Sequence, residues 1–493
     1  MSTGERKTRR MNRRRGASPV RVGLCALILV LASAGGAAAQ TPQGSTVVLS
    51  VRDAVKAALT RSPEVKGAAL DVEAFLAKKQ QADGARWPQL TALGVVGPSA
   101  EAERLDGSGL STPLRSINAR EGTVNGAFGR LDLLLVQPIY TFGLIDNLRA
   151  AAEHGVRAQK AGRDKTASEV GLRVREAYTG LLLFKELGSL LGDFHEQLIK
   201  AGERLELLQE GGFAAEQDLF KLRAFQGELE KNINLAARGH SIAAEALRVW
   251  TGRPPGVMIE PSESRLAADL EPLAPLESFV EDARAKRPEF TQLAEGLRAR
   301  RALVEAARAR AWPMVFFGIQ GSVAQATNRD RVLNNAYISD PLQHAYIGPV
   351  LGLKYDLDFG VSAGRVREAE AEVGKLEALR MQAVDGIPLQ VAKAYGEVRE
   401  AAQNVGALDR AHVNAKQWVV SASANFDLGI GDTKDLADAV LALAKTRAEY
   451  LQAVFNYRVG LARLDNAAGR DLEELRALMA DAATSLTTAE GSR

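Results

Sequence analysis

Apolar side chains recur every three to four residues along two long stretches of the chain. In the first stretch they are Val174, Ala177, Leu181, Phe184 and Leu191, and in the second they are Val391, Ala394, Val398, Ala401 and Leu408. This spacing is that of a coiled-coil seam. The first stretch runs from Phe142-Gly143 to about Glu210, which as a helix is on the order of 100 Å long. Such helices predict a rod or tube wall rather than an ordinary domain core.

Shorter helical patterns flank the long ones. The chain is helix-like from about Val51 to Arg86, and Ser62 before Pro63 fits a cap and first-turn pair that divides this segment in two. The first long helix breaks at Gly211-Gly212 and resumes from about Ala215 to Trp250. These patterns predict a helical hairpin, and the second long stretch predicts another.

Four short stretches are β-like instead, at residues 89–97, 130–140, 314–323 and 346–357. They form two hairpins, each with a polar loop between its strands. Strands of about 9–11 residues have the length that crosses a bilayer, and they also fit a soluble hairpin below the helices. Four strands cannot close a barrel, and an open strand edge is not viable in lipid. If the strands span a membrane, several chains share one barrel, and three chains give twelve strands.

Paired motifs predict that one unit is duplicated. Pro63-Glu64 and Pro288-Glu289 each open a helical segment, and each is followed by a Trp-Pro pair at the same spacing. A further set keeps one constant offset along the chain, which we call the repeat offset: Phe142-Gly143 with Phe359-Gly360, Tyr178 with Tyr395, Gly212 with Gly429, Asp218-Leu219 with Asp435-Leu436, and Gly252-Arg253 with Gly469-Arg470. The apolar seam residues of the two long stretches keep this offset too. The only change of offset falls in the strand and loop segments.

These boundaries predict the domain organisation. Residues 1–39 are a signal peptide, 40–255 the first repeat, 256–275 a linker, 276–470 the second repeat and 471–493 a C-terminal tail. The β-hairpins occupy 89–140 and 314–357, and the helical tips lie near 211–218 and 429–435.

The N-terminus has the features of a secretory signal peptide. A basic region precedes the apolar run Leu24 to Ala34, and Ala37-Ala38-Ala39 offers a cleavage site. Removing residues 1–39 takes away eight of the 63 basic residues and one of the 60 acidic ones, which leaves 55 against 59 and a net charge of −4. This balance argues against a nucleic-acid partner. The single cysteine, Cys25, lies in the removed segment, so we expect no disulfide framework.

Catalytic and metal-binding patterns are missing from the sequence. No histidine stands at ligand spacing from another histidine or cysteine, and the chain has no Gly-x-Ser-x-Gly and no phosphate-binding loop. His195 and His412 share the repeat offset and fall in the helical seam, where we interpret them as core or interface residues. The sequence therefore predicts no enzyme activity, no cofactor and no metal.

Several motifs together resemble those of TolC-type outer-membrane efflux proteins, the outer membrane factors. They are Leu49 to Ala54 leading to Ser62-Pro63-Glu64, Gln137 to Gly143, Leu357 to Gly360, and the two Gly-x5-Asp-Leu tips at Gly212 to Leu219 and Gly429 to Leu436. Each motif is weak alone, but their duplicated order is specific. The resemblance covers about Leu49 to Arg470.

The resemblance implies a mixed α+β membrane protein that assembles as a homotrimer. Its twelve-stranded β-barrel, with four strands per chain, would stand in outer-membrane lipid and continue as a long α-helical coiled-coil barrel through the periplasm. It implies a passive exit duct of a tripartite efflux or type I secretion system. The implied partners are a periplasmic adaptor (a membrane fusion protein) and an inner-membrane pump. The exported substrate does not follow from the sequence.

The resemblance also assigns roles at the helical tips. Gly211, Gly212, Gly429 and Gly431 would form the tips where adaptors dock. Asp435 and Asp438 match positions that line the periplasmic constriction, where three copies of each would form anionic rings. Asp218 matches a residue that helps to hold the closed state by hydrogen bonding.

Two positions depart from the family pattern. Phe426 stands where a tyrosine is expected, and Gly431 stands where an arginine is expected, so neither can make the closing bond of that side chain. The alternative interpretation of Asp435 and Asp438 is a solvated helix face.

Trp87 and Trp312 precede the strands in both units. They fit an aromatic girdle at the periplasmic edge of the membrane, and they equally fit packing at a helix–strand junction. The rival for the whole chain is a soluble periplasmic coiled-coil scaffold or adaptor. The two β-hairpins disfavour it, because adaptors usually carry one helical hairpin flanked by β-domains.

Overall fold

The computed structural model describes residues 46–100, 124–212, 215–327, 341–428, 430 and 433–490. The predicted signal peptide lies outside these ranges. The first half comprises β1 (Thr46–Leu49), α1 (Val51–Arg61), α2 (Pro63–Gly84), β2 (Gln89–Ala100), β3 (Val124–Tyr140), α3 (Leu144–Glu210) and α4 (Glu216–Trp250). The second comprises β4 (Met258–Pro261), α5 (Leu276–Lys286), α6 (Pro288–Ala309), β5 (Met314–Ala326), β6 (His344–Lys354), α7 (Val361–Asp427), α8 (Thr433–Ala468) and α9 (Leu472–Glu490).

Local caps explain where the short helices begin and end. The side chain of Ser50 accepts a hydrogen bond from Asp53 N at 3.1 Å, and Ser62 accepts one from Glu64 N at 3.3 Å. Pro63 occupies the first turn of α2, where its missing N–H costs nothing. The Ser-Pro pair therefore divides the 51–86 segment into α1 and α2, as the sequence predicts.

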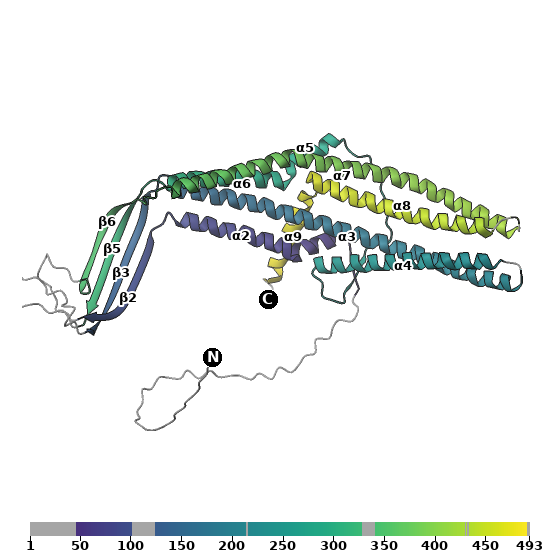
Figure 1. Ribbon diagram of the computed structural model, residues 1–493, viewed down its shortest axis with the longest axis horizontal. Coiled ribbons are helices and arrows are strands. Elements are labelled where there is room, and N and C mark those ends of the chain that lie inside the picture. The colour runs from purple at the N-terminus through teal and green to yellow at the C-terminus, as the bar shows by residue number, and fades with distance from the viewer. Residues whose placement is uncertain are drawn as a thin grey trace, which may run out of the picture. The chain divides into compact units, whose positions relative to one another are not determined.

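The strands β2, β3, β5 and β6 form one antiparallel sheet in that order (Figure 1). Their ends differ from the sequence-based bounds. β3 begins at Val124 rather than near Arg130, because its backbone continues to pair with β2 and β5 beyond the apolar stretch. β6 ends at Lys354 rather than at residue 357, because Lys354 pairs with Met314, the first residue of β5.

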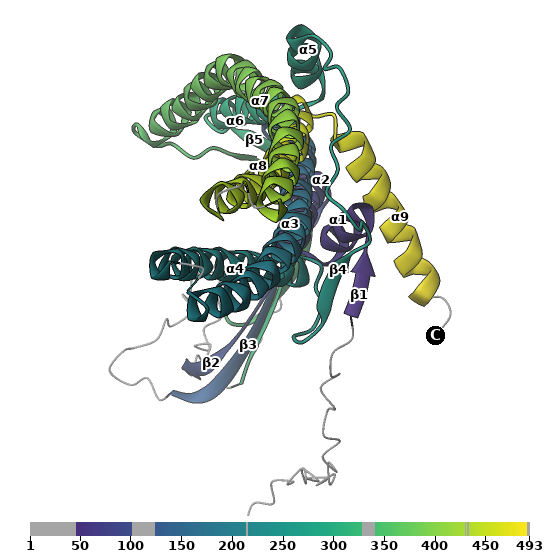
Figure 2. The same ribbon diagram turned by 90° about the vertical axis from the view of Figure 1, so that its right-hand side faces the viewer.

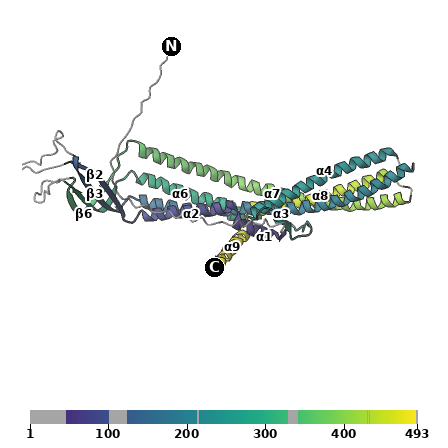
Figure 3. The ribbon, with the colours of Figure 1, turned by 90° about the horizontal axis from the view of Figure 1, so that it is seen from below.

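The two long helices each have 67 residues. Each begins after a glycine whose backbone is left-handed, Gly143 at φ 85° and Gly360 at φ 106°. Residues other than glycine rarely adopt this conformation. α3 packs against α4 and α8, and α7 packs against α8 (Figure 1). α2 and α6 run alongside α3, and α6 also packs against α7 (Figure 3). No helix within the described residues combines the length and hydropathy needed to cross a membrane.

The main core lies where the long helices meet the smaller elements. Tyr178, Leu181, Val391, Leu451 and Leu464 are almost completely buried there, and we call their surroundings the middle core. The predicted seam is thus buried along much of its length. Figure 2 shows α1, the β1–β4 pair and α9 near α3; α1 and α9 both contact α3, and α9 contacts α1.

Three of these elements have no counterpart in the sequence analysis. β1 and β4 form a parallel pair with Val47 opposite Ile259, so the segment 256–275 is more than a linker. The sequence predicts only a tail over residues 471–493, yet α9 buries Leu475 and Leu478. Apolar residues at a spacing of three in Leu472, Leu475 and Leu478 explain why this segment forms a packed helix.

Candidate functional site

The predicted site lies where the long helices end in turns. Gly211 and Gly212 form the turn between α3 and α4, where Gly212 N donates to Gln209 O at 2.9 Å. Gly212 has φ 77°, and a Cβ added there would meet nothing within 4 Å. A side chain at position 212 would have room, but the positive φ favours glycine there. Gly429 and Gly431, the other two predicted docking glycines, lie outside the described residues.

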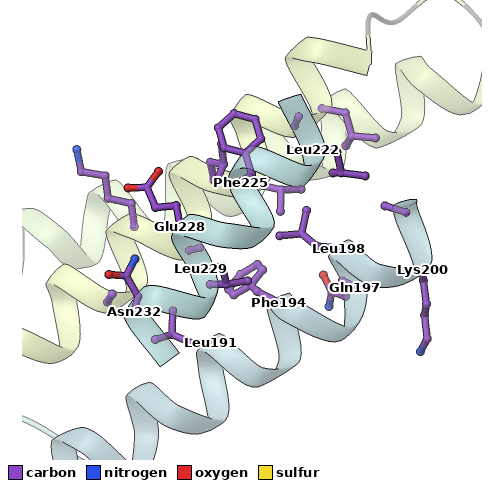
Figure 4. Close-up of a pocket in the computed structure, with 18 of the residues that line it drawn as sticks. Leu191, Phe194, Gln197, Leu198, Lys200, Leu222, Phe225, Glu228, Leu229 and Asn232 are labelled. Atoms are coloured by element: carbon purple, nitrogen blue, oxygen red, sulfur yellow. The ribbon is translucent and has the colours of Figure 1, made fainter. Parts of the chain in front are cut away.

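A large groove separates the two helical hairpins near these ends. Its volume is about 1130 Å³, and all four long helices contribute to its lining. Figure 4 shows Phe194 and Leu198 of α3 facing Phe225 and Leu229 of α4, whereas Lys200 points away. We call this cavity the hairpin groove. Its lining is mainly apolar, so the helices here leave apolar surface without a packing partner in the described part of the chain.

Phe426 of α7 lies on the wall of the hairpin groove, together with Leu436 and Val440 of α8. The tyrosine expected at position 426 would carry a hydroxyl, but phenylalanine contributes only apolar surface. At this position the chain contributes a half-buried ring in place of a hydrogen-bonding group.

Asp435 lies in the first turn of α8 and is tied to α7. Its Oδ1 accepts a hydrogen bond from Trp418 Nε1 at 3.1 Å. A carboxylate in the first turn also interacts favourably with the helix dipole. The carboxylate is thus held by a contact across the hairpin and lies where the helix dipole favours a negative charge.

Asp438 and Asp218 lie on a second, smaller cavity of about 110 Å³. Lys221 of α4 and Lys434 of α8 line it as well. Lys221 Nζ contacts Asp218 Oδ1 at 3.1 Å within α4. The structure therefore brings two predicted gate residues, one from each hairpin, to a single cavity of mixed charge. Asp435 does not line this cavity.

The two seam histidines lie on α3 and α7, farther from the hairpin ends than the predicted gate residues. The Nδ1 atoms of His195 and His412 are buried and have no hydrogen-bond partner among the described residues. Burial lowers the pKa of His412, and the nearby Arg447 lowers it further. These features fit the interpretation as core or interface residues.

The two tryptophans at the helix–strand junctions are exposed. Trp87 is 71% and Trp312 is 62% exposed. Trp312 stacks on Phe142 with ring centroids 5.4 Å apart, and Phe142 contacts Tyr140 edge to face at 4.7 Å. Packing at the junction accounts for part of the surroundings of Trp312, and the exposed faces of both rings stay available to a membrane interface.

No group of three or more His, Cys, Asp or Glu side chains in the described ranges is placed to hold a metal ion. The site is instead a pair of hairpin ends with apolar walls and a few charges. Sequence reasoning missed Trp418, Lys221 and Lys434. A signal for Lys221 existed, because it precedes Asp438 by the repeat offset and inverts its charge.

Known proteins match this chain in two ways: a family model matches part of its sequence, and solved structures share its fold. The family model described as outer membrane efflux protein matches residues 279–470. No curated protein matches in a sequence comparison. The resemblance to TolC-type outer-membrane efflux proteins is confirmed.

Solved outer membrane proteins share the fold at low sequence identity. CusC, a channel-forming protein, is 18% identical with a TM-score of 0.67, over 86% of this chain and 92% of its own. VceC from Vibrio cholerae is 17% identical with a TM-score of 0.67, over 85% and 96%. The MtrE channel of Neisseria gonorrhoeae, solved in an open state, is 18% identical with a TM-score of 0.65, over 85% and 88%.

Proposed function

We propose that the chain is one subunit of a passive exit duct for export across the periplasm and the outer membrane. The premise is that residues 279–470 match the outer membrane efflux protein family. One observation carries the proposal. A four-stranded sheet adjoins the starts of α3 and α7. The hairpin ends, where α3 is followed by α4 and α7 by α8, lie on the order of 100 Å away along each helix. This arrangement fits a sheet in the membrane and hairpins in the periplasm.

The sheet supports assembly of three chains into one barrel. β2 and β6 are its edge strands, and each has one side without a strand partner in the described residues. Open edges are not viable in lipid. Apolar side chains on these strands are exposed in the single chain, namely Leu90 and Val96 on β2 and Ile347, Leu351 and Leu353 on β6. Three copies paired edge to edge give the twelve strands of one barrel.

The duplicated unit supports the helical barrel. α2 and α6 have 22 residues each, α1 and α5 have 11 each, and α3 and α7 have 67 each. Duplication accounts for these equal lengths. Two similar hairpins per chain would give three chains a wall of pseudo-equivalent helices.

The hairpin ends form the periplasmic entrance in this proposal. Three copies of Asp435 and of Asp438 make anionic rings there, and the glycine turns dock a periplasmic adaptor joined to an inner-membrane pump. Carboxylate rings favour cations at a pore mouth. Both tripartite efflux and type I secretion use such a duct, and the pump decides between them.

Conductance of the purified trimer in planar bilayers tests the channel and its rings together. Single channels of the wild type should be cation-selective and blocked by multivalent cations. Asp435→Ala with Asp438→Ala should reduce both selectivity and block, whereas Asp409→Ala in α7 should change neither. Unchanged selectivity and block in the double variant would contradict the rings.

Fractionation tests the assembly. We expect heat-modifiable, SDS-resistant oligomers in the outer-membrane fraction. A monomer released by osmotic shock would instead support the soluble scaffold.

A further inference from the structure

Asp435 and Asp438 stand one helical turn apart, yet their surroundings differ. Asp435 Oδ1 accepts the indole N–H of Trp418, which lies on α7 of the same hairpin. Asp438 lines the small cavity shared with α4, beside Lys221 and Lys434. The two carboxylates therefore face different helices, although the family resemblance assigns both the same role.

The first hairpin shows that this link is a feature of the second hairpin alone. At the repeat offset, Asp218 corresponds to Asp435, and Lys221 corresponds to Asp438. Asp218 is bound by Lys221 on its own helix at 3.1 Å. The position that corresponds to Trp418 holds Ala201, which has no donor. In the first hairpin, Lys221 supplies a cation to Asp218. In the second hairpin the corresponding residue is Asp438, which has no cation to offer Asp435, and Trp418 donates to Asp435 instead.

The chemistry of the tryptophan suits a positioning role. The indole N–H donates and cannot accept, so it complements the carboxylate oxygen of Asp435, which accepts. The side chain has only two rotatable bonds, so holding its ring costs little conformational entropy. Trp418 lies more than two helical turns before the end of α7 at Asp427. Its hydrogen bond therefore links the first turn of α8 to the body of α7 rather than to its last turn.

We propose that Trp418 is a positioning residue for the Asp435 ring, holding each carboxylate at a fixed depth and angle at the pore entrance. This inference rests on the proposed duct. This bond needs neither a tyrosine at 426 nor an arginine at 431, because it lies inside one hairpin rather than between hairpins.

Bilayer conductance of Trp418→Phe tests the positioning role, because this variant keeps the aromatic ring and every charge but removes the donor. We expect cation block to weaken by roughly two- to ten-fold, as for the loss of one ordinary hydrogen bond. In an Asp435→Asn background the same substitution should add nothing, since the two residues act as one unit. Trp250→Phe, at the end of α4 beside the middle core, is the matched control and should leave block unchanged. Equal block in wild type and Trp418→Phe, or additive effects in the double variant, would overturn the proposal.

A spectroscopic measurement separates this inference from the proposed duct. The chain has four tryptophans, so ¹⁹F spectra of trimer labelled with 5-fluorotryptophan are simple, and Trp418→Phe identifies its resonance. Asp435→Asn should shift this resonance, and Asp438→Asn should not. A Trp418 resonance that does not shift in Asp435→Asn contradicts the Trp418–Asp435 hydrogen bond, even if the conductance of the rings is as proposed. A shift without any effect of Asp435→Ala and Asp438→Ala on conductance would overturn the rings and the positioning role, while showing that the bond itself exists.

Discussion

The middle core and the hairpin groove are built on the same long helices but differ in what fills the space between them. In the middle core, Leu181 of α3, Val391 of α7 and Leu464 of α8 are almost completely buried, and α1, α9 and the β1–β4 pair pack around them. Farther along the same helices, the hairpin groove leaves about 1130 Å³ unfilled. Close packing resists movement, whereas an unfilled groove does not. The comparison indicates a close-packed middle and two hairpins that can move relative to each other, while each keeps its own internal contacts.

The largest expected effect comes from truncating leucines in the two regions of α3. Leu181→Ala removes a fully buried side chain and should lower the free energy of unfolding by about 2–5 kcal/mol. Leu198→Ala, on the groove wall of the same helix, should cost less than about half as much, because the side chain is only half-buried. Guanidinium unfolding of the purified protein in detergent measures both losses. Equal losses would contradict the difference in packing.

Asp471 beside the middle core and His412 on α7, away from that core, should also respond to pH in opposite directions. Burial raises the pKa of Asp471, which joins α9 to the middle core, against the hydrogen bond from Ser168 Oγ to its Oδ2 at 2.6 Å and the charge of Arg175. A raised carboxyl pKa means that the folded state binds the proton more tightly, so the associated stability is present in acid and is lost as pH rises through the folded pKa. The neighbouring Asp465 is shifted the same way, also by burial.

His412 on α7 has the opposite sign. Burial, then Arg447 and also Lys416, lower its pKa, and Asp409 opposes them. The neutral ring is therefore favoured in the fold, and its contribution to stability is present above the ordinary pKa of 6.5 and is lost as pH falls through the lowered folded value. Acid should loosen the helix pair α7–α8 near His412 while it tightens α9.

Hydrogen exchange at pH 5 and pH 8, corrected for the intrinsic rate, measures these responses. Peptides of α9 should be better protected at pH 5, and peptides around residue 412 should be better protected at pH 8. Asp465→Asn with Asp471→Asn should flatten the first response, and His412→Gln should flatten the second. The same sign in both regions, or slopes that survive these substitutions, would show that other groups control them.

The sequence predicted the features that depend on local chemistry. Ser62-Pro63 and Gly143 place helix starts because caps and left-handed backbone are properties of a few adjacent residues. The ends of β3 and β6 depend on pairing partners far away in the chain, and β1 and β4 are too short to give a periodic signal. Trp418 could not be recognised in advance, because its bond to Asp435 depends on how α7 and α8 pack across the turn.

The smallest expected effect concerns the ion pair that crosses the first hairpin. Arg223 of α4 contacts Glu206 of α3 at 2.9 Å, and both side chains are about half exposed, at 57% and 49%. Solvent screening and the entropy of two long side chains limit such pairs to about 0–1 kcal/mol. Glu206→Gln should therefore leave the unfolding midpoint nearly unchanged, as should Glu228→Gln, whose own contact with Lys231 is longer at 4.0 Å. A loss as large as that of Leu181→Ala would mean that surface charge, rather than packing, holds this hairpin together.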